Sequence, residues 1–192
     1  MAEKAAKRDI AQEKDQSVKK VRALLEDKKL RLEVQEKWKS MVHGTYPFDT
    51  VGFLHTNTNQ FANPVGYRTN EAAEAIVAML LVDTPDVDAL GKAVDEIIQV
   101  RAIQEFSPEA AVGIFYGMKD ILREMVENAE QPEDYRLGLQ ELESRLDAVS
   151  LMAFGVYARC REKLHLIRVD EVKRSTSQLR RLAERRGSLP VE

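Results

Sequence analysis

Apolar residues recur every three or four positions through most of the chain, with two well-formed stripes in its middle. The first stripe begins at Val87 and ends before Arg101, and the second begins at Ala111. Each has the period of an amphipathic α-helix. Their apolar members are Val87, Leu90, Val94, Ile97 and Ile98, then Ala111, Ile114, Phe115, Met118, Ile121, Leu122 and Met125. The pattern therefore predicts two helices joined by a short corner.

The corner between these helices carries a stop and a restart signal. Ser107 suits the N-cap position, because its hydroxyl can accept a hydrogen bond from the unpaired N–H groups of the next turn. Pro108 suits the first helical position, and Glu109 complements the positive end of the helix dipole. We expect a tight corner at Phe106-Ser107-Pro108, and we expect the flanking segments to pack on it.

The amino-terminal part predicts helix from Val18 to about Val42, as one bent helix or two short ones, with Trp38 as a core anchor. Residues 44–69 then lose the helical pattern. Their aromatic residues are Tyr46, Phe48, Phe53, Phe61 and Tyr67. Because aromatic side chains can pin a loop to the core, we expect this loop to be ordered and to hold a ligand or partner site.

The helix boundaries around this loop depend on a few punctuating residues. Asn63 precedes a proline and is expected to be extended or in a turn, and Gly66 is expected to supply a positive φ. Asn70 is the predicted N-cap of a helix that ends near residue 82. Thr84 is the predicted N-cap of the following helix, with Pro85 in its first position.

The carboxy-terminal part contains no proline between Pro132 and the last few residues, and it predicts one long helix that ends near Gly187. Its apolar positions advance by threes and fours, at Leu142, Leu146, Val149, Ala153, Val156, Cys160, Leu164 and Ile167. From Arg168 onward they thin out among seven basic residues. A helix too polar to be buried alone commonly pairs with a copy of itself, so we expect a homodimer through this carboxy-terminal helix.

Composition and charge narrow the class of protein. The 192 residues suffice for one helical domain, and neither a membrane-spanning stretch nor a signal peptide is visible, so we expect a cytoplasmic protein without direct membrane insertion. Residues 1–40 hold 12 Lys or Arg against 8 Asp or Glu, whereas residues 83–147 hold 6 against 16. No basic face interleaves with aromatic residues, so we expect no nucleic-acid partner.

Catalytic and metal-binding patterns are missing from the sequence. Its three histidines are far apart, its single cysteine has no neighbour at a metal-ligand spacing, and neither a Gly-rich phosphate loop nor a G-x-S-x-G motif occurs. We therefore expect a non-enzymatic protein without a cofactor. Arg101 and Gln104 stand out, because they lie on or near an apolar stripe. Arg101 either has a structural role, paired with Glu105, Asp95 or carbonyls of the 61–67 loop, or recognises an anion or partner.

Four sequence blocks together resemble one family. They are T-Y-P at 45–47, F-A-N-P-V-G-Y at 61–67, R-A-I-Q-E-F-S-P-E-A-A at 101–111 and A-F-G-V-Y-A-R-C-R-E at 153–162. In combination they look like the RsbRD amino-terminal domain family, which is similar to the sensory domain of RsbR regulators of the general stress sigma factor. The resemblance implies an all-α, globin-like bundle without haem, which dimerises and is linked by a long helix to a STAS domain. The sequence shows no alternating β/α region, so we expect a free-standing module.

The resemblance also sets the expected organisation and function. Residues 1–16 form a polar extension, residues 17–167 the RsbRD-like helical domain, and residues 168–192 a basic linker-like helix and tail. As a bacterial signalling module of sigma-factor regulation, the domain would act through contacts with a protein partner. The predicted ligand or partner site consists of Tyr46, Phe61, Asn63, Tyr67, Arg101 and Gln104. Alternatively, the chain is an accessory or adaptor subunit of a membrane-associated respiratory redox complex, since standalone members resemble such companions.

Overall fold

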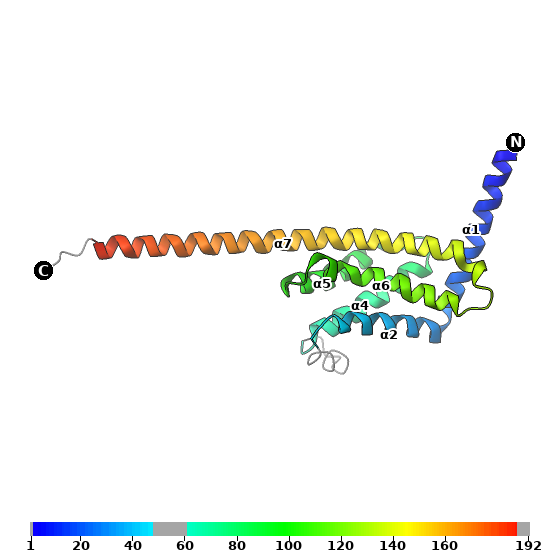
Figure 1. Cartoon of the computed structure of the whole chain (residues 1–192), viewed down its shortest axis with the longest axis horizontal. Helices are drawn as coiled ribbons and strands as arrows, with labels where there is room; N and C mark the ends of the chain where they lie inside the picture. The colour runs from blue at the N-terminus through cyan, green and yellow to red at the C-terminus, as the bar shows by residue number, and fades with distance from the viewer. Residues whose placement is uncertain (1, 48–60, 188–192) are drawn as a thin grey trace.

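The computed structural model describes residues 2–47 and 61–187, and all regular structure in those two ranges is helical (Figure 1). The all-α prediction is thus confirmed for the part of the chain that is described. In order, with the labels of Figure 1, the elements are α1 (Ala2–Glu26), α2 (Lys28–Gly44), α4 (Pro64–Leu81), α5 (Val87–Ile103), α6 (Pro108–Glu127), the 3-10 turn η1 (Pro132–Tyr135) and α7 (Arg136–Gly187).

The amino-terminal region forms two helices, α1 and α2, which meet at Asp27. The Asp27 carboxylate accepts a hydrogen bond from Leu30 N–H at 2.9 Å, and it therefore serves as the N-cap of α2. The first half of α1 projects away from the bundle (Figure 1). The α2 helix packs against α4 and α6, and its Trp38 is fully buried and donates from Nε1 to the Ile114 carbonyl at 2.7 Å. The predicted core role of Trp38 is confirmed.

The N-cap of α4 lies seven residues before the predicted N-cap Asn70. It is Asn63, whose side chain accepts a hydrogen bond from Gly66 N–H at 2.9 Å, and Pro64 occupies the first position. Together these two residues satisfy the helix start, so α4 runs straight through Asn70. The expectation of a positive φ at Gly66 was also wrong, because Gly66 lies within the first turn of α4.

The α5 helix has Asp86 as its N-cap, two residues later than the predicted Thr84. The Asp86 carboxylate accepts from Ala89 N–H at 2.9 Å, and the helix begins at Val87. A carboxylate at this position accepts a hydrogen bond from a free N–H group and also interacts favourably with the helix dipole, which explains why Asp86 and not Thr84 is the N-cap.

The corner between α5 and α6 agrees with the sequence-based prediction. Ser107 is the N-cap of α6 and accepts from Ala110 N–H at 3.4 Å, and Pro108 is the first helical residue. The chain reverses through Glu105, which has a left-handed φ of 63°. Few residues other than glycine adopt this conformation, so the backbone is locally strained at Glu105.

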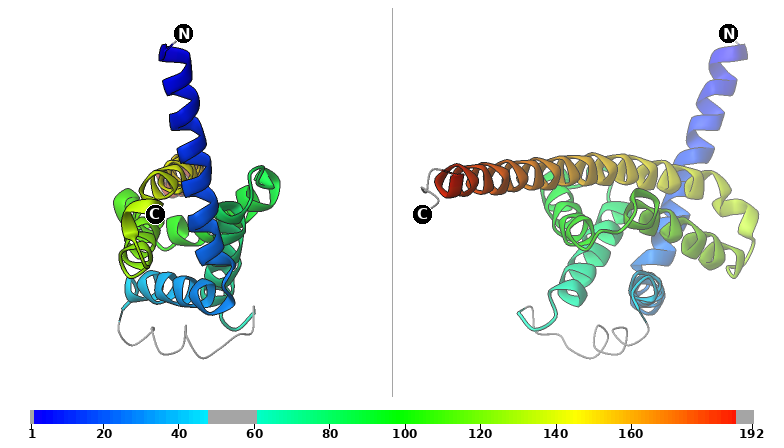
Figure 2. Two further views of the ribbon diagram at one scale, coloured as in Figure 1. Left: turned by 90° about the vertical axis from the view of Figure 1, so that its right-hand side faces the viewer. Right: turned by 60° about the vertical axis from the view of Figure 1, so that its left-hand side comes forward.

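The long α7 helix runs across the bundle and then extends beyond it (Figures 1 and 2). It crosses α1 at Gly138, where an added Cβ would lie 2.3 Å from the Ser17 carbonyl oxygen. Ser17 Oγ accepts from Gly138 N–H at 2.8 Å and donates to the Asp134 carbonyl at 2.7 Å. Only glycine fits such a close crossing. The side chains that α7 buries in the core are Leu142, Leu146, Val149, Ala153, Val156 and Tyr157.

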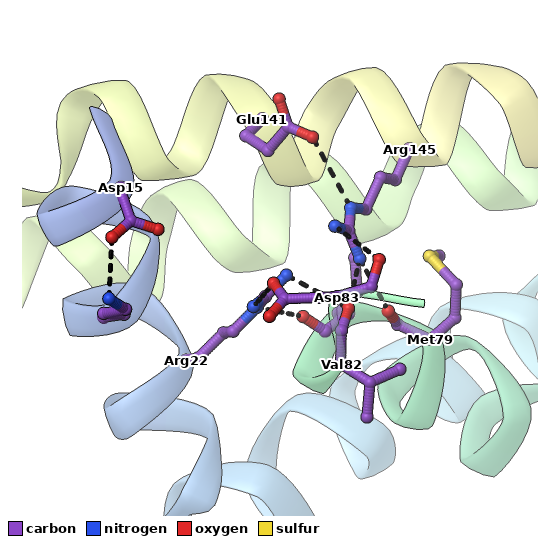
Figure 3. A network of polar contacts seen from close by, with 9 residues as sticks. Asp15, Arg22, Met79, Val82, Asp83, Glu141 and Arg145 are labelled. Carbon is purple, nitrogen blue, oxygen red and sulfur yellow. Dashed lines mark hydrogen bonds and ion pairs between the residues drawn. The ribbon is translucent and has the colours of Figure 1, made fainter. Parts of the chain in front are cut away.

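Arginines from α1 and α7 meet at the carboxy-terminal end of α4 (Figure 3). Arg22 donates from Nε to the Leu80 carbonyl at 3.2 Å and from Nη2 to the Val82 carbonyl at 3.0 Å, and its Nη1 pairs with the Asp83 carboxylate. Arg145 donates to the carbonyls of Val82 and Asp83 as well. Helix ends leave carbonyls unpaired and carry a negative partial charge, so these arginines fasten α4 to both neighbouring helices.

Within residues 2–47 and 61–187, each helix is too short or too polar to reach across a lipid bilayer.

Candidate functional site

The α5–α6 corner brings together side chains from two parts of the chain that lie far apart in sequence. Thr45 and Tyr46 follow α2, whereas Arg101, Gln104 and Phe106 belong to the end of α5 and the corner. We refer to these five residues as the corner cluster. Three of the six predicted site residues, Tyr46, Arg101 and Gln104, therefore come together.

Arg101 is the centre of the corner cluster and is fully buried. Its Nη2 donates to Thr45 Oγ1 at 3.0 Å and to the Ala110 carbonyl at 2.9 Å. Its Nε and Nη1 have no hydrogen-bond partner within the described ranges. Arg101 thus carries a buried positive charge, and only one of its three guanidinium nitrogens has a hydrogen-bond acceptor among residues 2–47 and 61–187.

The predicted partners of Arg101 were wrong among the residues that the structure describes. Glu105 pairs with Arg168 on α7, and Asp95 accepts a hydrogen bond from Gln99. The acceptors of Arg101 are a threonine hydroxyl and a carbonyl in the first turn of α6. The positive φ at Glu105 turns the chain after Gln104, so Glu105 does not continue the helical face on which an i, i+4 pair with Arg101 would form.

Two aromatic rings flank the Arg101 guanidinium. The Phe106 ring centre lies 4.0 Å from the guanidinium carbon, and the Tyr46 ring centre lies 5.5 Å from it. The two rings are 5.1 Å apart in an edge-to-face arrangement. Aromatic faces carry negative partial charge, so they attract the cation, yet they offer far less compensation than a carboxylate.

The cluster is electrostatically unusual for both of its titratable members. Burial lowers the pKa of the Arg101 guanidinium, and the neighbouring Tyr46 counteracts this effect. Burial likewise raises the pKa of the Tyr46 hydroxyl, whereas the nearby Arg101 acts in the opposite direction. An arginine remains charged at any physiological pH, so the uncompensated charge persists within the fold.

Tyr46 and Gln104 form the outer part of the cluster. The Tyr46 hydroxyl donates to Gln104 Oε1 at 3.0 Å. Tyr46 is half-buried and Gln104 is exposed, whereas Arg101 beneath them has no exposed surface. This hydrogen bond therefore joins the two helix ends on the solvent side of the guanidinium.

The α7 helix holds the opposite side of the same corner. Tyr157 donates from its hydroxyl to the Phe106 carbonyl at 2.6 Å, and Arg161 donates to the Ala102 carbonyl at 3.3 Å. Two turns after Arg161, Arg168 pairs with Glu105 and thereby holds the pKa of the Glu105 carboxyl below its ordinary value. The corner is thus tied to α7 at three successive positions.

The other three predicted site residues lie at the start of α4. Asn63 is buried as the N-cap, Tyr67 is half-buried with the Arg68 guanidinium 5.3 Å from its ring centre, and Phe61 is 87% exposed. The expected packing of Phe61 against the core was wrong. Phe48 and Phe53 of the predicted aromatic loop lie outside the described residues.

Two members of the corner cluster were not predicted. Phe106 directly precedes the Ser107 cap, so its neighbourhood to Arg101 follows from the tightness of the turn. Thr45 is distant from Arg101 in sequence, and the contact between them depends on how α2 packs against the bundle. The T-Y-P block at residues 45–47 was the one sequence signal that pointed to it.

The family profile described as the RsbT co-antagonist protein RsbRD N-terminal domain matches residues 33–172. The chain belongs to this family. The match to the RsbRD N-terminal domain encloses the corner cluster and the α7 residues that hold it, and it ends at Val172 in the projecting part of α7. No curated protein and no solved structure matches the chain.

Proposed function

We propose that this chain is a non-enzymatic regulatory module of the RsbR type, which acts in stress signalling through protein contacts. Membership of the RsbRD N-terminal domain family supports a sensory or regulatory role. In our proposal, the corner cluster and the nearby start of α4 receive the signal and α7 transmits it. The module is cytoplasmic and bacterial, and it pairs with a second copy through α7.

The observation that carries this proposal is the path of α7. One continuous helix holds the α5–α6 corner through Tyr157, Arg161 and Arg168, and then projects from the bundle (Figure 1). A rigid helix that contacts a binding site along part of its length can transmit a small shift there to its projecting end. Any rearrangement around Arg101 would alter the position of the projecting segment.

The surface of the projecting segment supports pairing with a second copy. Val172, Leu179 and Leu182 are 64%, 68% and 56% exposed, in a segment in which most residues are polar. Val172 and Leu179 are seven residues apart, the spacing that places both on one seam of a coiled coil. A helix standing free of its bundle has little tertiary support, so burial against another helix would stabilise it.

The test is the mass of the full chain in solution, measured by sedimentation equilibrium, for the wild type and for Leu179→Asp. We expect a wild-type dimer that Leu179→Asp weakens at least tenfold, because a charge would enter the apolar seam. Gln178→Asp is the matched control. It introduces a carboxylate at the neighbouring exposed position, and it should leave the dimer unchanged.

A monomeric wild type would contradict the proposal and favour the adaptor alternative, in which the monomer binds a different protein. A dimer that survives Leu179→Asp and also survives deletion of residues 168–192 would show that pairing uses another surface. Either result is independent of what binds at the corner cluster.

A further inference from the structure

The corner cluster buries a cation for which the described chain provides no carboxylate. Arg101 has no exposed surface, and its two acceptors are the Thr45 hydroxyl and the Ala110 carbonyl. Taking an unpaired charge out of water is costly, and proteins normally offset it with an opposite charge. Here the two remaining nitrogens, Nε and Nη1, are left without any acceptor within the described ranges.

We propose that Arg101 binds a small monocarboxylate, one oxygen of which accepts a hydrogen bond from Nε. This inference rests on the proposed sensory function and names the class of its ligand. A guanidinium is suited to this role, because its positive charge is permanent and a hydrogen bond between two charged groups is strong. Thr45 and Ala110 keep the guanidinium in place by holding Nη2.

The charge of the corner cluster favours a singly charged ligand. Arg101 is the one cationic member of the five-residue cluster, so a monocarboxylate would neutralise it and a dianion such as phosphate would leave an excess negative charge. Burying that excess charge would be unfavourable. The rings of Phe106 and Tyr46 beside the guanidinium also suit a ligand with an apolar body attached to its carboxylate.

Access to Arg101 requires movement of the outer residues. Tyr46 and Gln104 are joined by one hydrogen bond on the solvent side of the cluster. Rotation of the Tyr46 side chain breaks this bond and opens a path to the guanidinium. Since Tyr46 follows α2 and Gln104 ends α5, ligand entry changes a contact between these helices, on the other side of the corner from the α7 residues Tyr157 and Arg161.

The experiment is a thermal unfolding series of the full chain in increasing sodium acetate, with sodium chloride at equal ionic strength as the reference. A ligand that binds only the folded state raises Tm with its concentration. We expect acetate to raise the wild-type Tm in a dose-dependent manner beyond the chloride reference, with sodium phosphate giving a smaller rise. Arg101→Met should abolish the additional rise.

The matched control is Arg68→Met, which removes an arginine that already pairs with Glu71 and Glu96. This variant should keep the wild-type response to acetate. An equal acetate response in Arg101→Met, or no response in the wild type, would overturn the inference. A larger effect of phosphate than of acetate would overturn the choice of a monocarboxylate.

A second measurement covers the case in which Arg101→Met does not fold. In wild-type protein with ¹⁵N-labelled arginine, acetate should shift the Arg101 Nε–H resonance and leave that of Arg68 in place. An unmoved Arg101 resonance at saturating acetate would refute binding there. Neither result bears on the dimer test with Leu179→Asp, so failure of the ligand class and failure of the proposed function remain distinguishable.

Discussion

Arg22 and Arg101 are two buried arginines that the same fold treats in different ways. Arg22 lies at the carboxy-terminal end of α4, where each of its three guanidinium nitrogens has an acceptor (Figure 3). Arg101 is more deeply buried, yet only one of its nitrogens is satisfied by the described protein. Burial of an arginine is therefore not in itself a sign of a structural role.

The difference between the two lies in what surrounds them. Arg22 donates to the carbonyls at the end of α4 and to the Asp83 carboxylate. The last carbonyls of a helix have no intrahelical donor, and Arg22 supplies one. Arg101 is bordered by the rings of Phe106 and Tyr46, and its Nε and Nη1 have no hydrogen-bond acceptor among the described residues. The first arrangement stabilises the fold, whereas the second keeps donors available for an external acceptor.

The largest expected effect is that of Arg22→Met on stability. The substitution removes the Arg22 donor to the Leu80 carbonyl, one of the two arginine donors to the Val82 carbonyl and the ion pair to Asp83, and we expect it to cost about 2 kcal/mol of the free energy of unfolding. Urea denaturation followed by circular dichroism measures this loss. Arg8→Met, at an exposed position of the same helix, should change stability by less than about 0.5 kcal/mol.

A smaller effect is expected for Arg101→Met in the absence of ligand. The variant loses two hydrogen bonds, to Thr45 and Ala110, but it also removes an uncompensated buried charge. Because these contributions have opposite signs, the net change should stay within about 1 kcal/mol. Urea denaturation of Arg101→Met and the wild type, followed by circular dichroism, measures this change in the free energy of unfolding. A loss as large as that of Arg22→Met would mean that both arginines are structural, and the contrast between them would disappear.

The contrast also marks the limit of prediction from sequence. Helical periodicity and the Ser107-Pro108 signal were sufficient to predict the central helices and their corner, because those features are local. The N-caps Asn63 and Asp86 were missed because another residue suited to capping, Asn70 or Thr84, follows or precedes each of them. The partners of Arg101 could not be predicted either. Thr45 is 56 residues away, and its contact depends on how α2 packs.

The pH dependence of the Arg22 clamp is a finer test. Arg22 lowers the pKa of the Asp83 carboxyl below its ordinary value, so this ion pair stabilises the fold above the unfolded pKa of about 4 and is lost as the pH falls through the lower, folded pKa. Asp83→Asn should therefore be less stable than the wild type at pH 7, and the difference should shrink toward pH 3. In an Arg22→Met background the pH dependence should be much weaker, because only the smaller attractions of Arg145 and Lys19 for the Asp83 carboxylate remain.

The smallest stability effect is expected for Tyr46→Phe, and it isolates the outer part of the corner cluster. The variant keeps the ring beside Arg101 and removes only the hydroxyl that bonds to Gln104, so the free energy of unfolding should change by less than about 0.5 kcal/mol. If that bond must break before a carboxylate reaches the guanidinium, the variant should bind acetate faster than the wild type, as followed by line broadening of the Arg101 Nε–H resonance. Tyr116→Phe, an exposed tyrosine on α6, should leave the rate unchanged. An unchanged rate in Tyr46→Phe would show that the hydroxyl does not control access, because breaking its bond would then lie outside the rate-limiting step.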